Sequence, residues 1–254
     1  MRDFSNRKPT QRFADRAMDY ARYRPSYPAA AVDWILEGLG DPVGLRIADI
    51  GAGTGISSRL FAERGAQVDA IEPNAQMSAA ALAHERVSFR GGTAERTSLR
   101  EASTDVVVAF QAFHWFAADA VMRELFRILR CGGRFAAAWN NHDMSDPFTA
   151  QYSKIIAQSS DEAVFMHRSR IAPPQETLAH AGFIHVERAK FAYNHRLELE
   201  GLLGRARSAS YLPLEGAQHD ATIGRLTDSY AQFADNEGYV TFRYRTVVYR
   251  AERP

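Results

Sequence analysis

The residues best suited to bind a ligand are a run of glycines and a single acid. Gly51-Ala52-Gly53-Thr54-Gly55 ends an apolar, strand-like run, and Glu72 closes the next apolar run 21 residues beyond Gly51. A glycine-rich turn lets backbone amides approach a ligand that side chains would block, and an acid ending a second strand accepts hydrogen bonds from ribose hydroxyls. Together they predict a site for a cofactor that carries a nucleoside.

The spacing of the glycines limits which cofactor fits. Gly55 comes one position too early for the dinucleotide fingerprint, and Ile56 stands where that fingerprint has Gly or Ala. A dinucleotide rests its pyrophosphate on the following helix, whereas a cofactor without phosphates needs the turn mainly for close backbone approach. The pattern favours a phosphate-free cofactor; a structural turn and a solvated acid are the alternatives for the glycines and for Glu72.

Two side chains beside the turn are candidate ligand contacts. Asp49 lies within an otherwise apolar strand, where an unpaired carboxylate is costly, so we expect it to meet backbone donors or a cationic group of the ligand. Its alternative is a satisfied structural acid. Met77, at the start of the next predicted helix, suits an adenine face, and the core is an equally good place for it.

Strands that alternate with helices must position these residues. Strand, helix, strand repetition implies a parallel sheet covered on both faces, so the sequence predicts an α/β fold. The run 106–110 is apolar without alternation and belongs at the sheet centre. Strands are predicted near 46–50, 67–72, 86–90, 104–110, 133–139, 183–192 and 239–250. Helices are predicted near 29–38, 56–64, 75–84, 119–130, 147–158, 175–181, 197–209 and 221–237.

Composition narrows the partners and the location. The chain has 254 residues and a formal net charge of +1, so it lacks the basic excess of a protein built around a phosphate backbone. Cys131 is the only cysteine, which excludes an intrachain disulfide and favours a reducing, cytoplasmic location. No apolar stretch approaches the roughly 20 residues of a membrane helix, and the N-terminus lacks a signal-peptide core. Hydrolase, phosphate-loop and zinc motifs are missing from the sequence, so no metal is expected.

The motifs resemble those of the class I S-adenosylmethionine-dependent methyltransferases, over about residues 12–140. The first motif of that family is similar to Ala48-Asp49-Ile50-Gly51-Ala52-Gly53-Thr54-Gly55, and its ribose acid is similar to Glu72 in Ile71-Glu72-Pro73-Asn74. Three further elements resemble Gly92-Thr93-Ala94-Glu95, Gln111-Ala112-Phe113-His114-Trp115-Phe116 and Leu129-Arg130-Cys131-Gly132-Gly133-Arg134-Phe135.

This resemblance implies a fold, a cofactor and its contacts. The fold would be a Rossmann-like, doubly wound, mostly parallel seven-stranded sheet with an antiparallel final strand and a helical cap. A single domain would span 1–254, with an N-terminal arm at 1–28, a cofactor-binding core at 29–140, and the remaining strands and cap at 141–254. Family members often carry an aspartate at the position of Thr93, so a backbone amide at Ala94 would read the adenine edge. The implied contacts of S-adenosyl-L-methionine are Tyr20, Arg24, Asp49, Gly51, Ala52, Gly53, Glu72, Pro73, Met77, Thr93, Ala94, Glu95 and Gln111.

The N-terminal segment narrows the resemblance further. Tyr20-Ala21-Arg22-Tyr23-Arg24-Pro25-Ser26-Tyr27-Pro28 is similar to an arm seen in a subgroup of small-molecule methyltransferases that includes the trans-aconitate enzymes. The resemblance implies an arm that folds over the cofactor, with Tyr20 and Arg24 near its methionine end. A solvent-exposed polar helix is the alternative, although aromatic-rich arms normally dock.

The methyl acceptor depends on residues beyond the fourth strand and in the cap. His114 follows that strand at the edge where open α/β sheets bind ligands, which makes it the candidate general base, with a packing role as the alternative. The predicted cap helix and its end offer Arg205, Arg207, Ser208 and Tyr211. Arg207 suits a substrate carboxylate because its planar fork fits that group, with a water-facing arginine as the alternative. The other candidates for substrate binding are Trp115, His142 and Tyr211.

The predicted activity is methyl transfer to a small-molecule acceptor by in-line displacement. A free carboxylate is a candidate acceptor because it needs no deprotonation near neutral pH. The alternatives are an NAD(P)-dependent oxidoreductase and an S-adenosylmethionine-binding protein without catalysis. A DNA adenine substrate is disfavoured, because Gln111-Ala112-Phe113-His114 replaces the Asn/Asp-Pro-Pro-aromatic run of base-modifying enzymes. The expected protein is a monomer or homodimer without nucleic-acid or membrane partners.

Overall fold

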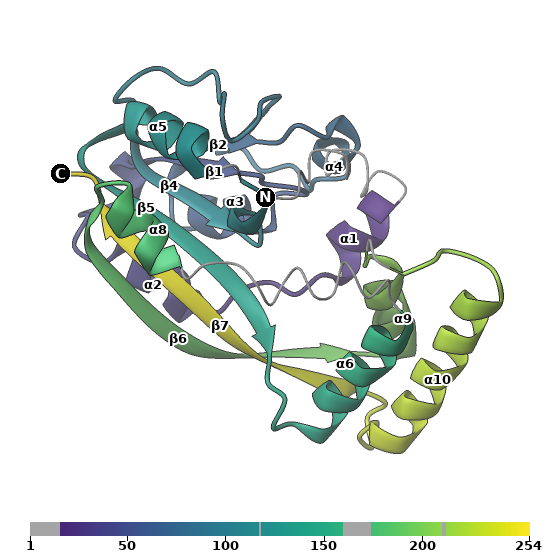
Figure 1. Cartoon of the computed structure of the whole chain (residues 1–254). Coiled ribbons are helices and arrows are strands. Elements are labelled where there is room, and N and C mark those ends of the chain that lie inside the picture. Colours follow the sequence, from purple (N-terminus) through teal and green to yellow (C-terminus); the bar gives the residue numbers. More distant parts are fainter. Residues whose placement is uncertain (1–15, 117, 160–173, 210–211) are drawn as a thin grey trace.

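A seven-stranded sheet runs through the centre of the protein (Figure 1). The computed structural model describes residues 16–116, 118–159, 174–209 and 212–254, and the structural statements below concern these residues. The strand order is β3-β2-β1-β4-β5-β7-β6. The strands are β1 (Arg46–Ile50), β2 (Gln67–Ile71), β3 (Val87–Arg90), β4 (Thr104–Phe110), β5 (Leu129–His142), β6 (Ile184–Leu197) and β7 (Val240–Glu252).

The sheet confirms the predicted topology. β1 pairs in parallel with β2 and with β4, and the final strand β7 runs antiparallel to both β5 and β6. The order of the strands therefore reverses between β1 and β4. Open α/β sheets bind ligands at such a point, beyond the carboxyl ends of the strands, and the glycine turn follows β1 at that edge.

The described helices follow the predicted order, with ends shifted by several residues in places. They are α1 (Ala17–Tyr23), α2 (Ala29–Leu36), α3 (Ile56–Ala62), α4 (Ala75–Ala79), α5 (Ala118–Ile128), α6 (Pro147–Ser159), α8 (Pro174–His180), α9 (Leu199–Arg207) and α10 (Ala217–Phe233). Two short 3-10 turns, η3 (Pro42–Gly44) and η4 (Phe113–Trp115), precede β1 and follow β4.

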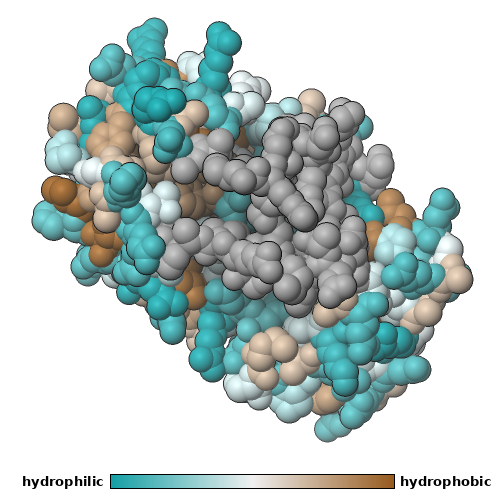
Figure 2. Space-filling model, viewed as in Figure 1, coloured by the Kyte–Doolittle hydropathy of each residue, from teal (hydrophilic) through white to brown (hydrophobic). Residues whose placement is uncertain are grey.

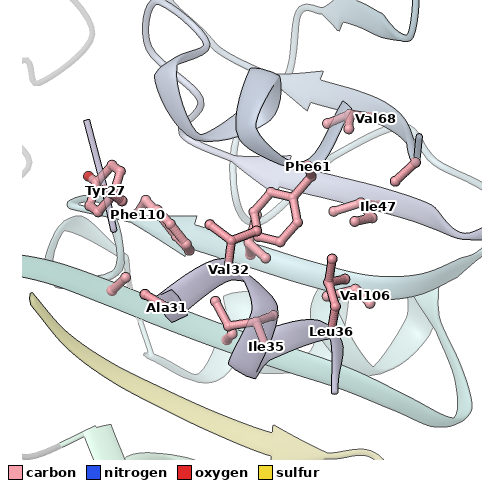
Figure 3. Close-up of a cluster of buried hydrophobic side chains, with 14 of the residues drawn as sticks. Tyr27, Ala31, Val32, Ile35, Leu36, Ile47, Phe61, Val68, Val106 and Phe110 are labelled. Atoms are coloured by element: carbon pink, nitrogen blue, oxygen red, sulfur yellow. The ribbon is translucent and has the colours of Figure 1, made fainter. Parts of the chain in front are cut away.

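Helices cover both faces of the sheet. On one face α2 and α3 pack against β1 and β4, and Figure 3 shows Val32 and Phe61 close to Ile47. On the other face α5 packs against β5 and α8 packs against β6 and β7, with side chains of β1 and β4 in the same apolar cluster. Because successive side chains of a strand point to opposite faces, Asp49 lies on the same face of β1 as Ile47. The acid is thereby directed toward α3.

The helix predicted near 75–84 is wrong beyond residue 79. α4 ends at Ala79, and Met77 is its only buried residue. Alanines favour a helix, yet a helix this short is held by packing more than by propensity. Leu82, the next large apolar side chain, is exposed, so the segment has nothing to anchor it as a helix.

Strands β5 and β6 are longer than the predicted spans 133–139 and 183–192. β5 begins at Leu129, which pairs with Thr104, so the helix predicted to reach residue 130 ends at Ile128. At its other end β5 reaches His142, opposite Tyr244 of β7. These extensions carry the sheet beyond its parallel part.

The cap consists of α6, α9 and α10, packed over the extended ends of β6 and β7 (Figure 1). It has its own apolar core, which contains Tyr152, Leu202, Leu226 and Phe242. The arm helix α1 lies against α9. The arm and the cap therefore form one wall beside the carboxyl edge of the sheet.

The face shown in Figure 2 is mainly hydrophilic, with small separate hydrophobic patches among the described residues. Large exposed apolar side chains such as Met18, Val43 and Leu82 come from different elements, and single exposures of this kind are ordinary in soluble folds. Within the described ranges, no helix has the length and apolar character needed to cross a bilayer.

Candidate active site

The glycine turn bends the chain directly after β1. Gly51 and Gly53 have φ angles of +72° and +57°, a region that residues with side chains rarely adopt. Space is also restricted, because a Cβ on Gly51 would lie 2.8 Å from the Cβ of Ala112. The amide of Gly51 donates to the carbonyl of Ile71 (2.9 Å), which fastens the turn to the end of β2. The turn therefore presents backbone to the space beyond the sheet edge.

The carboxylate of Glu72 is fixed by two backbone amides. Oε2 accepts from the amide of Gly53 and Oε1 from the amide of Asn74, both at 2.8 Å. Burial raises the pKa of Glu72, and the two amide hydrogen bonds oppose that rise. A carboxylate oxygen can accept more than one hydrogen bond, so Glu72 can still bind two hydroxyl groups. The glycine turn and Glu72, which the sequence assigned to one site, are therefore linked by a direct hydrogen bond.

Two cavities meet above the turn. The Glu72 cavity has a volume of about 220 Å³ and the His142 cavity one of about 510 Å³. The residues that line both, and so stand at their junction, are Tyr20, Gly51, Gly53, Phe110 and Gln111. Predicted cofactor contacts that line only the Glu72 cavity are Glu72, Pro73, Met77, Thr93, Ala94 and Glu95. Predicted contacts that line only the His142 cavity are Arg24 and Ala52.

Asp49 is fully buried in β1. Its Oδ2 accepts from the hydroxyls of Ser57 and Ser58, both at 2.6 Å, while its Oδ1 has no hydrogen-bond partner among the described residues. Burial raises the pKa of Asp49 to about 6, although both hydroxyls act in the opposite direction. A buried oxygen without a donor is costly, and a cationic group of a ligand would relieve that cost.

The His142 cavity brings together polar side chains from several elements. It is lined by His142 of β5, Arg205 of α9 and Tyr244 of β7. Arg205 is only 5% exposed, and the Tyr244 hydroxyl is buried without a hydrogen-bond partner in the described part of the chain. A cavity whose wall includes a buried cation and an unsatisfied hydroxyl favours a polar, negatively charged ligand.

His114 lies in η4, beyond β4, and also lines the His142 cavity. Its Nδ1 accepts a hydrogen bond from Nε1 of Trp139 (3.3 Å). Trp115 belongs to the same 3-10 turn. The sequence thus placed His114 at the correct edge of the sheet.

Comparison with known proteins decides the family. A profile for the methyltransferase domain matches residues 48–137. An uncharacterized methyltransferase of Mycobacterium tuberculosis is 31% identical over 252 residues, covering 97% of this chain and 98% of the relative. The chain belongs to the class I S-adenosylmethionine-dependent methyltransferases.

Solved structures agree with this assignment. A proposed type II methyltransferase from Anaeromyxobacter dehalogenans superposes with a TM-score of 0.59 at 26% identity, covering 91% of this chain and 98% of that one. A proposed methyltransferase from an antibiotic biosynthesis pathway of Anabaena variabilis, at 23% identity, shares the fold with a TM-score of 0.62 and covers 87% of this chain and 95% of that one. The cofactor is S-adenosylmethionine. The alternative prediction, an NAD(P)-dependent oxidoreductase, is therefore wrong.

The residues of this methyltransferase fit that cofactor. S-adenosylmethionine carries two ribose hydroxyls, and the carboxylate of Glu72 has acceptor capacity for both. It also carries an ammonium group, and Oδ1 of Asp49 is a buried acceptor without a donor among the described residues. Asp49 itself lines neither cavity, but Ser57, which donates to it, lines the His142 cavity. The close backbone approach that a ligand without phosphates needs is provided by Gly51 and Gly53.

The arm of the methyltransferase is fastened to α9. Nε of Arg24 donates to Oγ of Ser208 (2.9 Å), and Nε of Arg207 pairs with Asp19 of the arm (3.1 Å). These contacts place Tyr20 and Arg24 on the wall of the His142 cavity. The prediction that the arm docks over the site is consistent with this position.

The two arginines of α9 lie in different surroundings, and the substrate role given to Arg207 stays a prediction. Arg205 lines the His142 cavity, whereas Arg207 is engaged by the arm. Residues two apart on a helix face different sides, so only one of the two could point inward. The apolar spacing of Leu202 and Ala206 marks the buried face to which Arg205 belongs, and this signal was available in the sequence. Tyr211 lies outside the described residues.

Proposed function

We propose that this methyltransferase transfers the methyl group to a small organic acid held in the His142 cavity. The observation that carries the proposal is Arg205, a nearly buried cation on the cavity wall. A guanidinium removed from water binds a carboxylate strongly because the two planar groups match in charge and geometry. Tyr244 supplies a second polar contact from β7.

The two cavities are proposed to divide the substrates between them. The Glu72 cavity would hold the nucleoside, with the ribose on Glu72 and the adenine between Met77 and the backbone at Ala94. The methionine end would extend across the glycine turn toward Tyr20. The acceptor would then occupy the His142 cavity, which meets the Glu72 cavity at that turn.

The chemistry places modest demands on the protein. When bound, S-adenosylmethionine supplies a methyl group that is already activated on its sulfonium. The side chains of the protein then need to hold the acceptor in line with the bond that breaks and to exclude water. Arg205 would orient the acid, while the docked arm would close the cavity on the side of Tyr20 and Arg24.

Labelled methyl transfer tests the proposal. The wild-type protein is expected to methylate members of a panel of small carboxylic acids and to leave the matching amides unmodified. Arg205→Gln should lower transfer by roughly 10- to 100-fold, since a hydrogen bond to a charged group contributes about 1.5–3 kcal/mol. Arg196→Gln, which removes a surface arginine paired with Asp235, is the matched control and should leave transfer unchanged.

Binding of S-adenosylhomocysteine, measured by titration calorimetry, separates the two substrates. Arg205→Gln should retain wild-type affinity for it. An equal loss of this affinity would assign Arg205 to the cofactor, and an unchanged transfer rate would remove it from the acceptor site.

A further inference from the structure

Two histidines line the His142 cavity, and their hydrogen bonds place their protons differently. His114 follows β4 and His142 ends β5, so both lie at the ligand-binding edge of the sheet. A neutral imidazole carries one proton, on Nδ1 or on Nε2, and the partner of one nitrogen fixes the state of the other.

The proton of neutral His114 belongs on Nε2. Its Nδ1 lies 3.3 Å from Nε1 of Trp139, and an indole nitrogen can only donate a hydrogen bond. Nδ1 of His114 must therefore accept, which leaves the one ring proton on Nε2. In this state Nε2 is a donor and has no lone pair with which to take a proton.

The proton of neutral His142 belongs on Nδ1. That nitrogen lies 2.7 Å from Oγ of Ser153, and the same Oγ lies 2.7 Å from the backbone carbonyl of Thr149. A hydroxyl has one proton to donate and a carbonyl has none. Both contacts are hydrogen bonds only if Ser153 donates to Thr149 and His142 donates to Ser153. Nε2 of His142 then carries the lone pair.

Packing holds the ring of His142 in this orientation. Its centroid lies 5.3 Å from that of Tyr244, and 5.9 Å from those of Tyr152 and Phe242. Tyr152 and Phe242 belong to the core of the cap. A flip of the ring would put Cδ2 in the place of Nδ1 and break the bond to Ser153 of α6, so α6 helps to maintain the arrangement.

We propose that Nε2 of His142 accepts the proton of the methyl acceptor, and that the methylated atom is a hydroxyl or amine of the bound acid. This inference rests on the proposed function and makes the carboxylate the group that is recognised. A carboxylate is already ionised near neutral pH and needs no base, whereas a hydroxyl or amine benefits from one.

The proposed step balances as follows. The acceptor heteroatom forms the bond to the methyl carbon, and the carbon–sulfur bond breaks with its electron pair kept by sulfur. The proton of the heteroatom passes to Nε2 of His142 and later returns to solvent. His114, with a proton on Nε2, donates a hydrogen bond that orients the acceptor.

Nitrogen NMR tests the proton positions without any acceptor. In ¹⁵N-labelled protein, above the pH at which imidazoles titrate, two-bond correlations distinguish a protonated ring nitrogen from one with a lone pair. The expected result is an Nε2 proton on His114 and an Nδ1 proton on His142, with His114→Gln and His142→Gln assigning the signals. Ser153→Ala should let the His142 proton move to Nε2, whereas Trp139→Phe should leave His142 unchanged. An Nε2 proton on His142 in the wild-type protein would overturn the inference.

Labelled methyl transfer to lactate, alanine and propionate tests the role. Lactate or alanine should accept the methyl group and propionate should not. His142→Gln should lose about 100-fold or more of the rate, the lower range for general base catalysis, while His114→Gln, which keeps a donor, should lose much less. Methylation of propionate, or full activity of His142→Gln, would contradict the inference. Transfer to none of the three acids would count against the organic-acid proposal and leave the NMR result standing.

Discussion

The two cavities of this methyltransferase are built in opposite ways. The Glu72 cavity is assembled from the ends of adjacent strands, and the hydrogen bond between Gly53 and Glu72 joins residues only 19 apart. The His142 cavity joins distant parts of the chain, as the bond between Arg24 and Ser208, 184 residues apart, illustrates. The first is fixed by strand order, and the second depends on the docking of the arm and the cap.

This difference implies that binding of the cofactor and binding of the methyl acceptor can be altered separately. Because the sheet edge forms much of the Glu72 cavity, any chain that keeps β1 and β2 in place keeps the cofactor contacts predicted there. The proposed acceptor contacts come from elements added around the sheet, which can vary without disturbing it. Changes at Glu72 should therefore affect cofactor binding, whereas changes at the arm, whose Tyr20 lines both cavities, should affect the acceptor side as well.

Removal of the Glu72 carboxylate should have the largest effect. Glu72→Ala would lose two charge-assisted hydrogen bonds to the ribose, which corresponds to roughly 2–4 kcal/mol of S-adenosylhomocysteine affinity. Titration calorimetry measures this directly. Glu101→Ala, at an exposed acid that lines neither cavity, is the control and should change little. Wild-type affinity in Glu72→Ala would show that another group binds the ribose.

Ionisation of the buried carboxyl of Asp49 should lower the stability of the folded protein. Its pKa is raised from 3.8 to about 6, so the folded state holds a proton that the unfolded state has lost, and stability falls as pH rises from about 4 to 6. Asp49→Asn should therefore be more stable than the wild type above pH 6, by about 2–3 kcal/mol, and the difference should vanish below pH 4.

Denaturant unfolding of the ligand-free protein at several pH values measures this difference. The same variant should bind S-adenosylhomocysteine more weakly, because it cannot pair with the ammonium group. An Asp49→Asn protein that is less stable than the wild type at pH 8 would mean that the ionised acid is already satisfied.

Gly204→Ala should loosen the contact between the arm and α9, beside the His142 cavity. A Cβ at this position would lie 2.2 Å from Cδ2 of Tyr23 in the arm, and overpacking of this kind costs about 1–3 kcal/mol. Faster hydrogen exchange across 17–23 should report the loosened arm, with smaller changes at Glu72. Gly224→Ala is the matched control, because its Cβ would meet no atom within 4 Å, and alanine should stabilise α10 by up to about 1 kcal/mol. Equal stability of the two variants would show that the arm adapts at no cost.

The two cavities also differ in how well the sequence predicts them. The strands around the cofactor were predictable because their apolar runs and turns are local signals, and β1 and β4 match their predicted ends. Glu72 and the glycine turn were predictable because their chemistry depends on position along two neighbouring strands. Here short-range pattern and structure coincide.

The acceptor half could be predicted only in part, because its geometry is set by tertiary contacts. The choice between Arg205 and Arg207 depends on the rotation of α9, which is fixed where Gly204 meets Tyr23. The proton positions of His142 depend on Ser153 of α6, and no spacing in the sequence relates those two residues to a hydrogen-bond direction. A residue type and its place at the sheet edge were predictable, but its orientation was not.

The ion pair between Asp19 and Arg207 should have the smallest effect. The two side chains are 32% and 33% exposed, and pairs of this kind contribute about 0.2–1 kcal/mol, less at high salt. A double-mutant cycle of Asp19→Asn and Arg207→Gln, followed by denaturant unfolding at low and high salt, isolates the coupling. The rate of methyl transfer should fall in these variants only as far as hydrogen exchange shows that the arm has undocked. If Arg207→Gln instead abolished transfer while hydrogen exchange showed the arm still docked, Arg207 would be the substrate-binding arginine that the sequence suggested. The substrate-binding arginine would then lie two residues further along α9 than Arg205.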